Sequence, residues 1–157
     1  MVKTVMKKPN INSWFEAQEV LDEGKNYVRK IAHNTWLEPQ PHFGSIGIRL
    51  HNTFILTYKR LHSESLGFHT EIKVDNGGWE TYTTKERLNQ FLPSTENFHI
   101  NVYQENFEWY WNIVFRDQRK KNRIAEYNND DVIKIWVDES GQYDFQLKDK
   151  KGRVKIG

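Results

Sequence analysis

The sequence contains no cysteine among its 157 residues. Disulfide bonds and thiolate chemistry are therefore excluded, and the absence fits a protein of a reducing compartment. No stretch of about 18 apolar residues occurs, so no helix is expected to span a membrane. The N-terminal stretch also lacks the apolar core of a signal peptide. These absences favour a cytoplasmic protein that does not enter a membrane.

The common sequence motifs of catalysis are also missing. The chain has neither a G-x-S-x-G nucleophile motif nor a Walker-type phosphate loop. Its six histidines, at positions 33, 42, 51, 62, 69 and 99, include no close-set pair such as H-x-H or H-x-x-x-H. A metal site needs several converging ligands. The sequence therefore predicts no enzyme, no metal site and no cofactor.

Aromatic residues are abundant: they make up 14% of the chain and include six tryptophans. Disordered chains are poor in such residues, so this one is expected to fold. The length fits a single domain over 1–157. Within it we expect an N-terminal helical segment over 1–25, a core over 26–115 and an appended hairpin over 116–157.

Two segments have the pattern of short helices. Ser13 and Glu16 have the S-x-x-E spacing of a capping box, which predicts a helix start near the N-terminus. A second, central helix is expected over Thr83–Leu92, where Thr83 and Glu86 repeat this spacing.

Alternating hydrophobicity predicts strands along most of the remaining chain. The pattern is clearest over 45–51, where Ile46, Ile48 and Leu50 share one side. Further strands are expected over 27–33, 35–38, 53–59, 68–75, 99–104, 107–115, 132–137, 142–147 and 153–156. The polar segment over 60–67 is expected to be an exposed loop. The sequence thus predicts an α+β fold with a twisted, mostly antiparallel sheet, an N-terminal helix, one central helix and a C-terminal hairpin.

In the strand over 107–115, aromatic and aliphatic residues recur at every second position. They are expected to face the core together, and they are Phe107, Trp109, Trp111, Ile113 and Phe115.

The stretch NGGWETYTTKERLN joins a turn signal, a tryptophan and a helix start. Its simplest interpretation is a turn, a core residue at Trp79 and a helix cap. An alternative interpretation is an anion site, because a helix N-terminus presents free N–H groups and partial positive charge. Thr83, Thr84, Lys85 and Arg87 would surround that charge, and Trp79 would stack on a base.

A second group of polar and aromatic residues lies upstream. Asn34, Thr35 and Trp36 precede a strand on which Arg49 and His51 occupy the face away from the core. An arginine on a sheet face is usually solvated or ion-paired. If this face meets the central helix start, the two groups would line one pocket.

Charge is balanced overall, at a net +2, but it is segregated locally. Residues Arg116–Arg123 carry five cations and one anion, a net of +4, and residues 126–139 carry one cation and five anions, a net of −4. A basic run after a tryptophan-rich strand is similar to a single-strand nucleic-acid groove. Because Trp109 and Trp111 are expected in the core, and the acidic block opposes a polyanion, a solvated loop is favoured over nucleic-acid binding.

Residues 32–111 resemble a small-protein family spread widely through tailed bacteriophages. The motifs that carry the resemblance are N-T-W-L, I-x-L-H-x-T and G-G-W-x-T-x-T-T-K-x-R-x-N, which begin here at Asn34, Ile48 and Gly77. The matching positions add Thr53, Thr81 and Asn89 to the residues named above. The chain departs from the family in a segment over 59–70 that looks inserted and in the tail beyond 115.

The resemblance implies a viral anti-defence protein of the nucleotide-sponge class. Such a protein binds a cyclic-nucleotide signal of CBASS or a related immune system, without cleaving it. The implied partner is a cyclic dinucleotide, and a homo-oligomer is a further expectation. The expected ligand-binding residues are Asn34, Thr35, Trp36, Arg49, His51, Trp79, Thr83, Thr84, Lys85 and Arg87. Two alternatives remain: a nucleic-acid-binding accessory protein that uses Arg116–Arg123, and an inhibitor of a host protein that acts through an aromatic surface.

Overall fold

The computed structural model describes residues 9–24, 28–40 and 44–157. The predicted α+β class with mostly antiparallel strands is confirmed. Two helices occur in the described residues, α1 (Trp14–Glu23) and α2 (Tyr82–Phe91). The strands are β1 (Arg29–Ala32), β2 (Thr35–Pro39), β3 (Ile46–Leu50), β4 (Thr53–Ser63), β5 (Gly67–Val74), β6 (Phe98–Glu105), β7 (Glu108–Phe115), β8 (Arg123–Glu126), β9 (Val132–Val137), β10 (Tyr143–Lys148) and β11 (Val154–Ile156).

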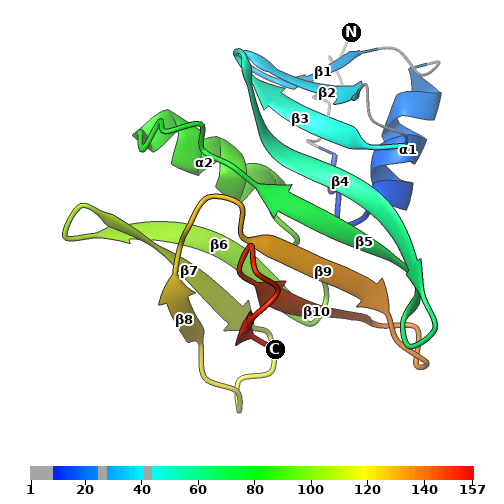
Figure 1. Ribbon diagram of the computed structural model, residues 1–157, viewed down its shortest axis with the longest axis vertical. Coiled ribbons are helices and arrows are strands. Elements are labelled where there is room, and N and C mark those ends of the chain that lie inside the picture. Colours follow the sequence, from blue (N-terminus) through cyan, green and yellow to red (C-terminus); the bar gives the residue numbers. More distant parts are fainter. Residues whose placement is uncertain (1–8, 25–27, 41–43) are drawn as a thin grey trace, which may run out of the picture.

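The strands form one large and one small antiparallel sheet (Figure 1). The large sheet has the order β1-β2-β3-β4-β5-β9-β10-β11, and the small sheet has the order β6-β7-β8. Strand β9 pairs with β5, with Ile72 opposite Ile133. The expected hairpin over 116–157 therefore contributes three strands to the large sheet and is continuous with it.

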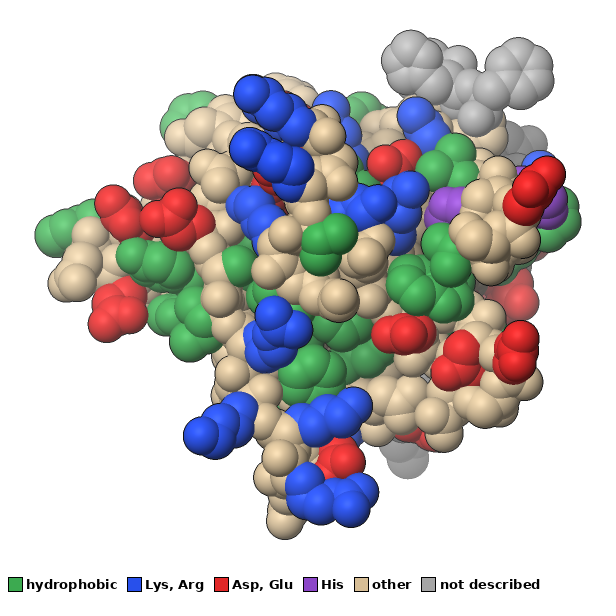
Figure 2. All heavy atoms as spheres, turned by 60° about the horizontal axis from the view of Figure 1, so that its bottom comes forward, with side chains coloured by type: hydrophobic (Ala, Val, Ile, Leu, Met, Phe, Trp, Pro, Cys, Tyr) green, Lys and Arg blue, Asp and Glu red, His purple; other side chains and the backbone are tan. Residues whose placement is uncertain are grey.

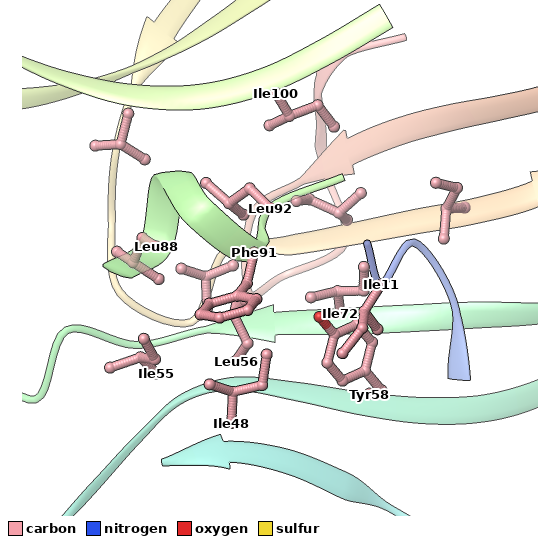
Figure 3. Close-up of a cluster of buried hydrophobic side chains, with 14 of the residues drawn as sticks. Ile11, Ile48, Ile55, Leu56, Tyr58, Ile72, Leu88, Phe91, Leu92 and Ile100 are labelled. Carbon is pink, nitrogen blue, oxygen red and sulfur yellow. The ribbon is translucent and has the colours of Figure 1, made fainter. Parts of the chain in front are cut away.

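The core lies on one face of the large sheet, under the helices and the small sheet. In Figure 3, Leu56 and Ile72 of the large sheet face Phe91 of α2, and Ile100 of β6 lies beyond the helix. Ile11, which precedes α1, packs into the same cluster. All five side chains are fully buried. Because each buried apolar side chain contributes roughly 1.5–3 kcal/mol, this cluster fixes α2 between the two sheets.

Helix α1 begins where the Ser13–Glu16 spacing places it. The Ser13 hydroxyl accepts a hydrogen bond from the Glu16 amide at 3.2 Å. The Glu16 side chain accepts from the Asn12 amide rather than from that of Ser13, so the capping box closes one residue earlier than the motif implies. Its other carboxylate oxygen accepts from the Tyr143 hydroxyl at 2.6 Å, which ties α1 to β10.

Three expectations about strands need correction. The segment over 60–67 is not a loop, because β4 continues to Ser63 and β5 begins at Gly67. Phe107 does not face the core: it lies in the turn before β7 and is exposed, whereas Trp109 and Trp111 are buried as predicted. Strand β8 was not predicted, because its side chains are largely exposed and show no apolar alternation. The start of the strand expected over 27–33 lies partly outside the described residues.

Candidate functional site

A pocket of about 460 Å³ lies between the β3–β4 turn and the loop that enters α2. This volume falls in the range of roughly 300–1,000 Å³ that is usual for small-molecule sites. Ten residues line the pocket: Leu50, His51, Asn52, Thr53, Ile55, Asn76, Trp79, Thr81, Thr83 and Thr84. Two stretches that are separate in the sequence, I-x-L-H-x-T and G-G-W-x-T-x-T-T-K, therefore meet at one place.

The loop before α2 is held by a buried amide. Asn76 is buried, and its Oδ1 accepts from the Gly78 amide at 2.8 Å and from Asn129 Nδ2 at 2.9 Å. Gly77 has a φ of +64°, and a Cβ there would lie 2.7 Å from Thr53 Cγ2. Glycine is needed both for the left-handed backbone and for the close approach of the two pocket walls.

Trp79 is the exposed aromatic wall of the pocket. Its side chain is 63% exposed, although it was given a core position in the simpler interpretation of this stretch. Its backbone amide donates to the Asn76 carbonyl at 2.9 Å. This bond fixes the backbone position from which the indole extends. An indole that is positioned by its backbone and open to solvent offers a flat stacking surface.

The first turn of α2 forms the polar wall. The N-cap is Thr81, whose hydroxyl accepts from the Thr84 amide at 3.2 Å, so the predicted cap at Thr83 is wrong by two residues. The hydroxyl oxygens of Thr81 and Thr84 lie 3.0 Å apart. The amides of Tyr82 and Thr83 belong to the first turn, where they have no partner within the helix. This wall can donate hydrogen bonds to an anion.

Arg49 and Trp36 lie outside the pocket, on the open face of the large sheet. Arg49 Nη2 is 3.1 Å from Glu38 Oε2, and Nε is 3.2 Å from the same oxygen. The guanidinium carbon stacks 4.9 Å from the centroid of the Trp36 ring. Arg49 also donates to the His51 carbonyl, so it supports the β3–β4 turn from behind. All of these contacts are within the protein, so Arg49 has a structural role.

Arg87, Thr35 and Asn34 also support the pocket from outside. Arg87 Nε donates to the Thr35 hydroxyl at 3.1 Å, and Thr35 is fully buried. The Asn34 carbonyl accepts from the His51 amide at 2.9 Å. These bonds tie α2 and the β3–β4 turn to the turn between β1 and β2. The three residues therefore position the pocket walls without lining them.

Lys85 and Asn89, on α2, also do not line the pocket. Lys85 Nζ lies 5.9 Å from the centroid of the exposed Tyr82 ring. The Asn89 side chain accepts from the Val102 amide at 2.7 Å and donates to its carbonyl at 2.8 Å, which ties α2 to β6. Of the ten expected binding residues, His51, Trp79, Thr83 and Thr84 line the pocket, and the other six do not. Asn52 and Asn76 are pocket residues that sequence reasoning missed, because asparagine in these positions signals only a turn.

The basic run over Arg116–Arg123 joins β7 to β8. Arg116 Nε donates to the Thr95 carbonyl at 2.7 Å, and Arg119 Nε lies 3.2 Å from Asp117 Oδ1. The neighbouring Trp109 and Trp111 are buried and do not offer their faces to a base.

Two further classes of site are not found in the described parts of the chain. No cluster of three histidine or carboxylate side chains there has the arrangement of a metal site. No helix among the described residues is long and apolar enough to cross a membrane.

Comparisons with known proteins give one match. The sequence profile of a family described as Kyanoviridae Gp96 protein matches residues 14–134, which include both walls of the pocket. No match was found among curated proteins, and none among solved structures. Since the matched region spans most of the sequence, this chain belongs to the Kyanoviridae Gp96 family of tailed-phage proteins.

Proposed function

We propose that this phage protein binds a cyclic nucleotide in the pocket beside Trp79 and sequesters it from a bacterial immune system without cleaving it. One observation carries the proposal: an exposed indole faces the pocket together with the hydroxyl-rich first turn of a helix. Nucleotides combine a flat base with an anionic phosphate, and these two walls suit the two parts.

In this proposal each wall has one task. The Trp79 ring stacks on a base, a contact worth about 1–3 kcal/mol. The hydroxyls of Thr83 and Thr84 and the free amides of the first turn donate to phosphate oxygens. His51, on the opposite wall, hydrogen-bonds a base edge or a phosphate oxygen.

The phosphate is recognised mainly by neutral donors and by the helix dipole. Arg49 and Arg87 are already bonded within the protein, so we assign them to positioning rather than to ligand contact. Lys85 follows directly after the pocket-lining threonines and supplies the nearest cation in the sequence of α2. A cation near the phosphate adds attraction that salt weakens.

The lining also favours binding over catalysis. Among the residues described as lining the pocket, His51 alone has an imidazole that could serve as an acid or a base, and no carboxylate stands among them. Acid–base cleavage of a phosphodiester usually needs more than one such group. We therefore propose that the ligand is released unchanged.

The size of the pocket bears on stoichiometry. At about 460 Å³, it suits one nucleotide half better than a whole cyclic dinucleotide with two bases and two phosphates. A second subunit would hold the other half, which makes a homo-oligomer part of the proposal.

The experiment is a melting screen of the full chain against a panel of cyclic di- and trinucleotides. A ligand at 100 times its Kd stabilises a protein by about 2.7 kcal/mol, which corresponds to a rise of about 5–10 °C in Tm. Trp79→Ala should abolish most of this rise. Phe68→Ala, which removes an equally exposed ring elsewhere, should keep it.

The results separate the candidate functions. The proposal is wrong if no nucleotide on the panel shifts Tm, or if Trp79→Ala responds like the unmodified protein. Ligand recovered in cleaved form would indicate an enzyme. Retention of DNA or RNA that is lost when the cations of 116–123 are neutralised would favour the nucleic-acid alternative.

A further inference from the structure

The turn between β6 and β7 holds an aromatic side chain in an unfavourable position. Asn106 and Phe107 have φ values of +51° and +66°, the left-handed pair typical of a two-residue hairpin turn. Glycine suits the second position, because a side chain there crowds the backbone. Phe107 is also 89% exposed. It therefore combines backbone strain with an apolar ring held in water, and neither helps the protein to fold.

The strand ends beside this turn are aromatic and acidic. Tyr103 and Tyr110 stack with ring centroids 5.5 Å apart, and the Tyr110 hydroxyl donates to Glu108 at 3.0 Å. The pKa of Tyr110 is raised, first by that hydrogen bond and then also by the charges of Glu108, Glu126 and Glu105. Three carboxylates therefore act on one tyrosine ring.

Within the described chain, no cation forms an ion pair with these carboxylates, although Lys155 Nζ donates to the backbone carbonyl of Glu126 at 2.9 Å. The ion pairs that the described residues form involve none of Glu105, Glu108 and Glu126. Figure 1 shows the β6–β7 turn as the leftmost part of the molecule, and Figure 2 shows acidic and hydrophobic side chains at that end, with lysines and arginines gathered elsewhere.

We propose that this acidic aromatic tip docks a cationic, arginine-rich segment of another protein. The tip is defined as Tyr103, Glu105, Phe107, Glu108 and Tyr110. Arginine suits it because the guanidinium group stacks on aromatic faces and pairs with carboxylates in a bidentate manner. Exposed aromatic residues and arginines are also the residues that most often dominate protein interfaces. Nucleic acid and anionic lipid carry the same sign of charge as the tip and are repelled.

A second copy of this chain is a weaker candidate for the occupant. It would offer its own basic run over 116–123, but two arginines of that run already have partners within the chain. Arg116 donates to the Thr95 carbonyl, and Arg119 forms an ion pair with Asp117. We therefore assign the tip to a different protein. This inference is independent of the proposed nucleotide site, because the two share no residue.

The test measures the binding of a short fluorescein-labelled peptide of alternating arginine and leucine to the full chain by fluorescence anisotropy. The decisive variant is Phe107→Gly, which keeps every carboxylate of the tip. It should weaken binding at least about tenfold. Because glycine relieves the left-handed backbone, the same variant should raise Tm by about 2–4 °C.

Two controls accompany this variant. Phe68→Ala removes an exposed ring that lies beside Arg60 and His62, and it should leave peptide affinity unchanged. The double variant Glu105→Gln with Glu108→Gln should weaken binding and reduce its dependence on salt.

Three results would overturn the inference. The first is a Phe107→Gly protein that binds the peptide as well as the unmodified chain. The second is an equal loss of affinity in Phe68→Ala. The third is self-association that depends on Phe107 in sedimentation experiments, which would make a second copy the occupant.

Discussion

Asp131 lies fully buried directly before β9, where one carboxylate oxygen serves three donors. Its Oδ2 atom accepts from Trp111 Nε1 at 2.8 Å, from the Asn128 amide at 2.9 Å and from Lys155 Nζ at 2.8 Å. Trp111 belongs to the small sheet and Lys155 to the large sheet. The carboxylate therefore links the two sheets at a point where water does not reach it.

We predict that Asp131→Asn lowers the free energy of unfolding by at least about 2 kcal/mol. The amide would leave Lys155 without its buried counter-charge, and broken buried pairs are costly. Guanidinium denaturation measures the loss. The matched control is Asp130→Asn, since the neighbouring Asp130 and Lys73 form an ion pair with side chains 43% and 56% exposed. That variant should change stability by less than about 1 kcal/mol. Equal losses in the two variants would contradict this account of Asp131.

His99 gives a prediction about pH. Partial burial and the nearby Arg116 charge lower the pKa of its imidazole. The folded protein thus keeps His99 neutral at pH values where the unfolded chain already binds a proton, so stability should fall as pH drops below about 6.5. In denaturation midpoints compared between about pH 7.5 and 5.5, His99→Gln should flatten this fall relative to the unmodified protein. An unchanged slope in His99→Gln would refute the prediction.

At the residue scale, the sequence identified structurally important side chains more reliably than it identified the role of each one. Arg49 and Arg87 were expected at a phosphate because their type suits one. Their partners, Glu38 and Thr35, lie 11 and 52 residues away in the sequence, and only the folded chain brings them within hydrogen-bond distance. Trp79 could be read as core or as a stacking surface, because both uses require the same residue type.

Among the elements, α2 shows which of two candidate N-cap threonines begins a helix. Thr81 and Thr83 both precede a helical run, and the second had the fuller capping-box pattern. The structure uses Thr81, which brings Thr83 into the pocket wall.

We predict that Thr81→Ala costs about 1 kcal/mol of stability, the usual effect of losing an N-cap hydroxyl. Thr83→Ala should be nearly neutral, because its side chain is exposed and caps nothing. Urea denaturation of both variants measures the difference. If the two variants exchanged places in this ranking, the helix would begin at the later threonine.

Strands were predictable where apolar residues recur at every second position of the sequence. β3 and β9 have this alternation, and their residues were predicted to within one or two positions. Almost every side chain of β8 is exposed. Its pairing with β7 depends on backbone hydrogen bonds, which require no particular residue types and so cannot be predicted from the sequence. The pairing of β5 with β9 is equally invisible in the sequence, because it joins segments separated by α2 and the whole small sheet.

For the whole molecule, the small sheet and α2 complete one face of the large sheet, and this arrangement sets both proposed surfaces. Packing of α2 through Phe91 fixes where its first turn meets the β3–β4 turn (Figure 3). The small sheet in turn carries the β6–β7 turn to the edge of the molecule (Figure 1). The pocket is thus a product of tertiary packing, although both of its walls are continuous stretches of sequence.

The central claim is that a cyclic nucleotide stacks on Trp79. Indole N–H signals of the six tryptophans, followed by NMR during titration with the cyclic nucleotide that raises Tm most, test it directly. The account predicts that the Trp79 signal shifts with saturation while that of the buried Trp111 stays in place, and that the ligand is recovered intact. A titration that moves the Trp36 signal and leaves Trp79 unchanged would contradict it.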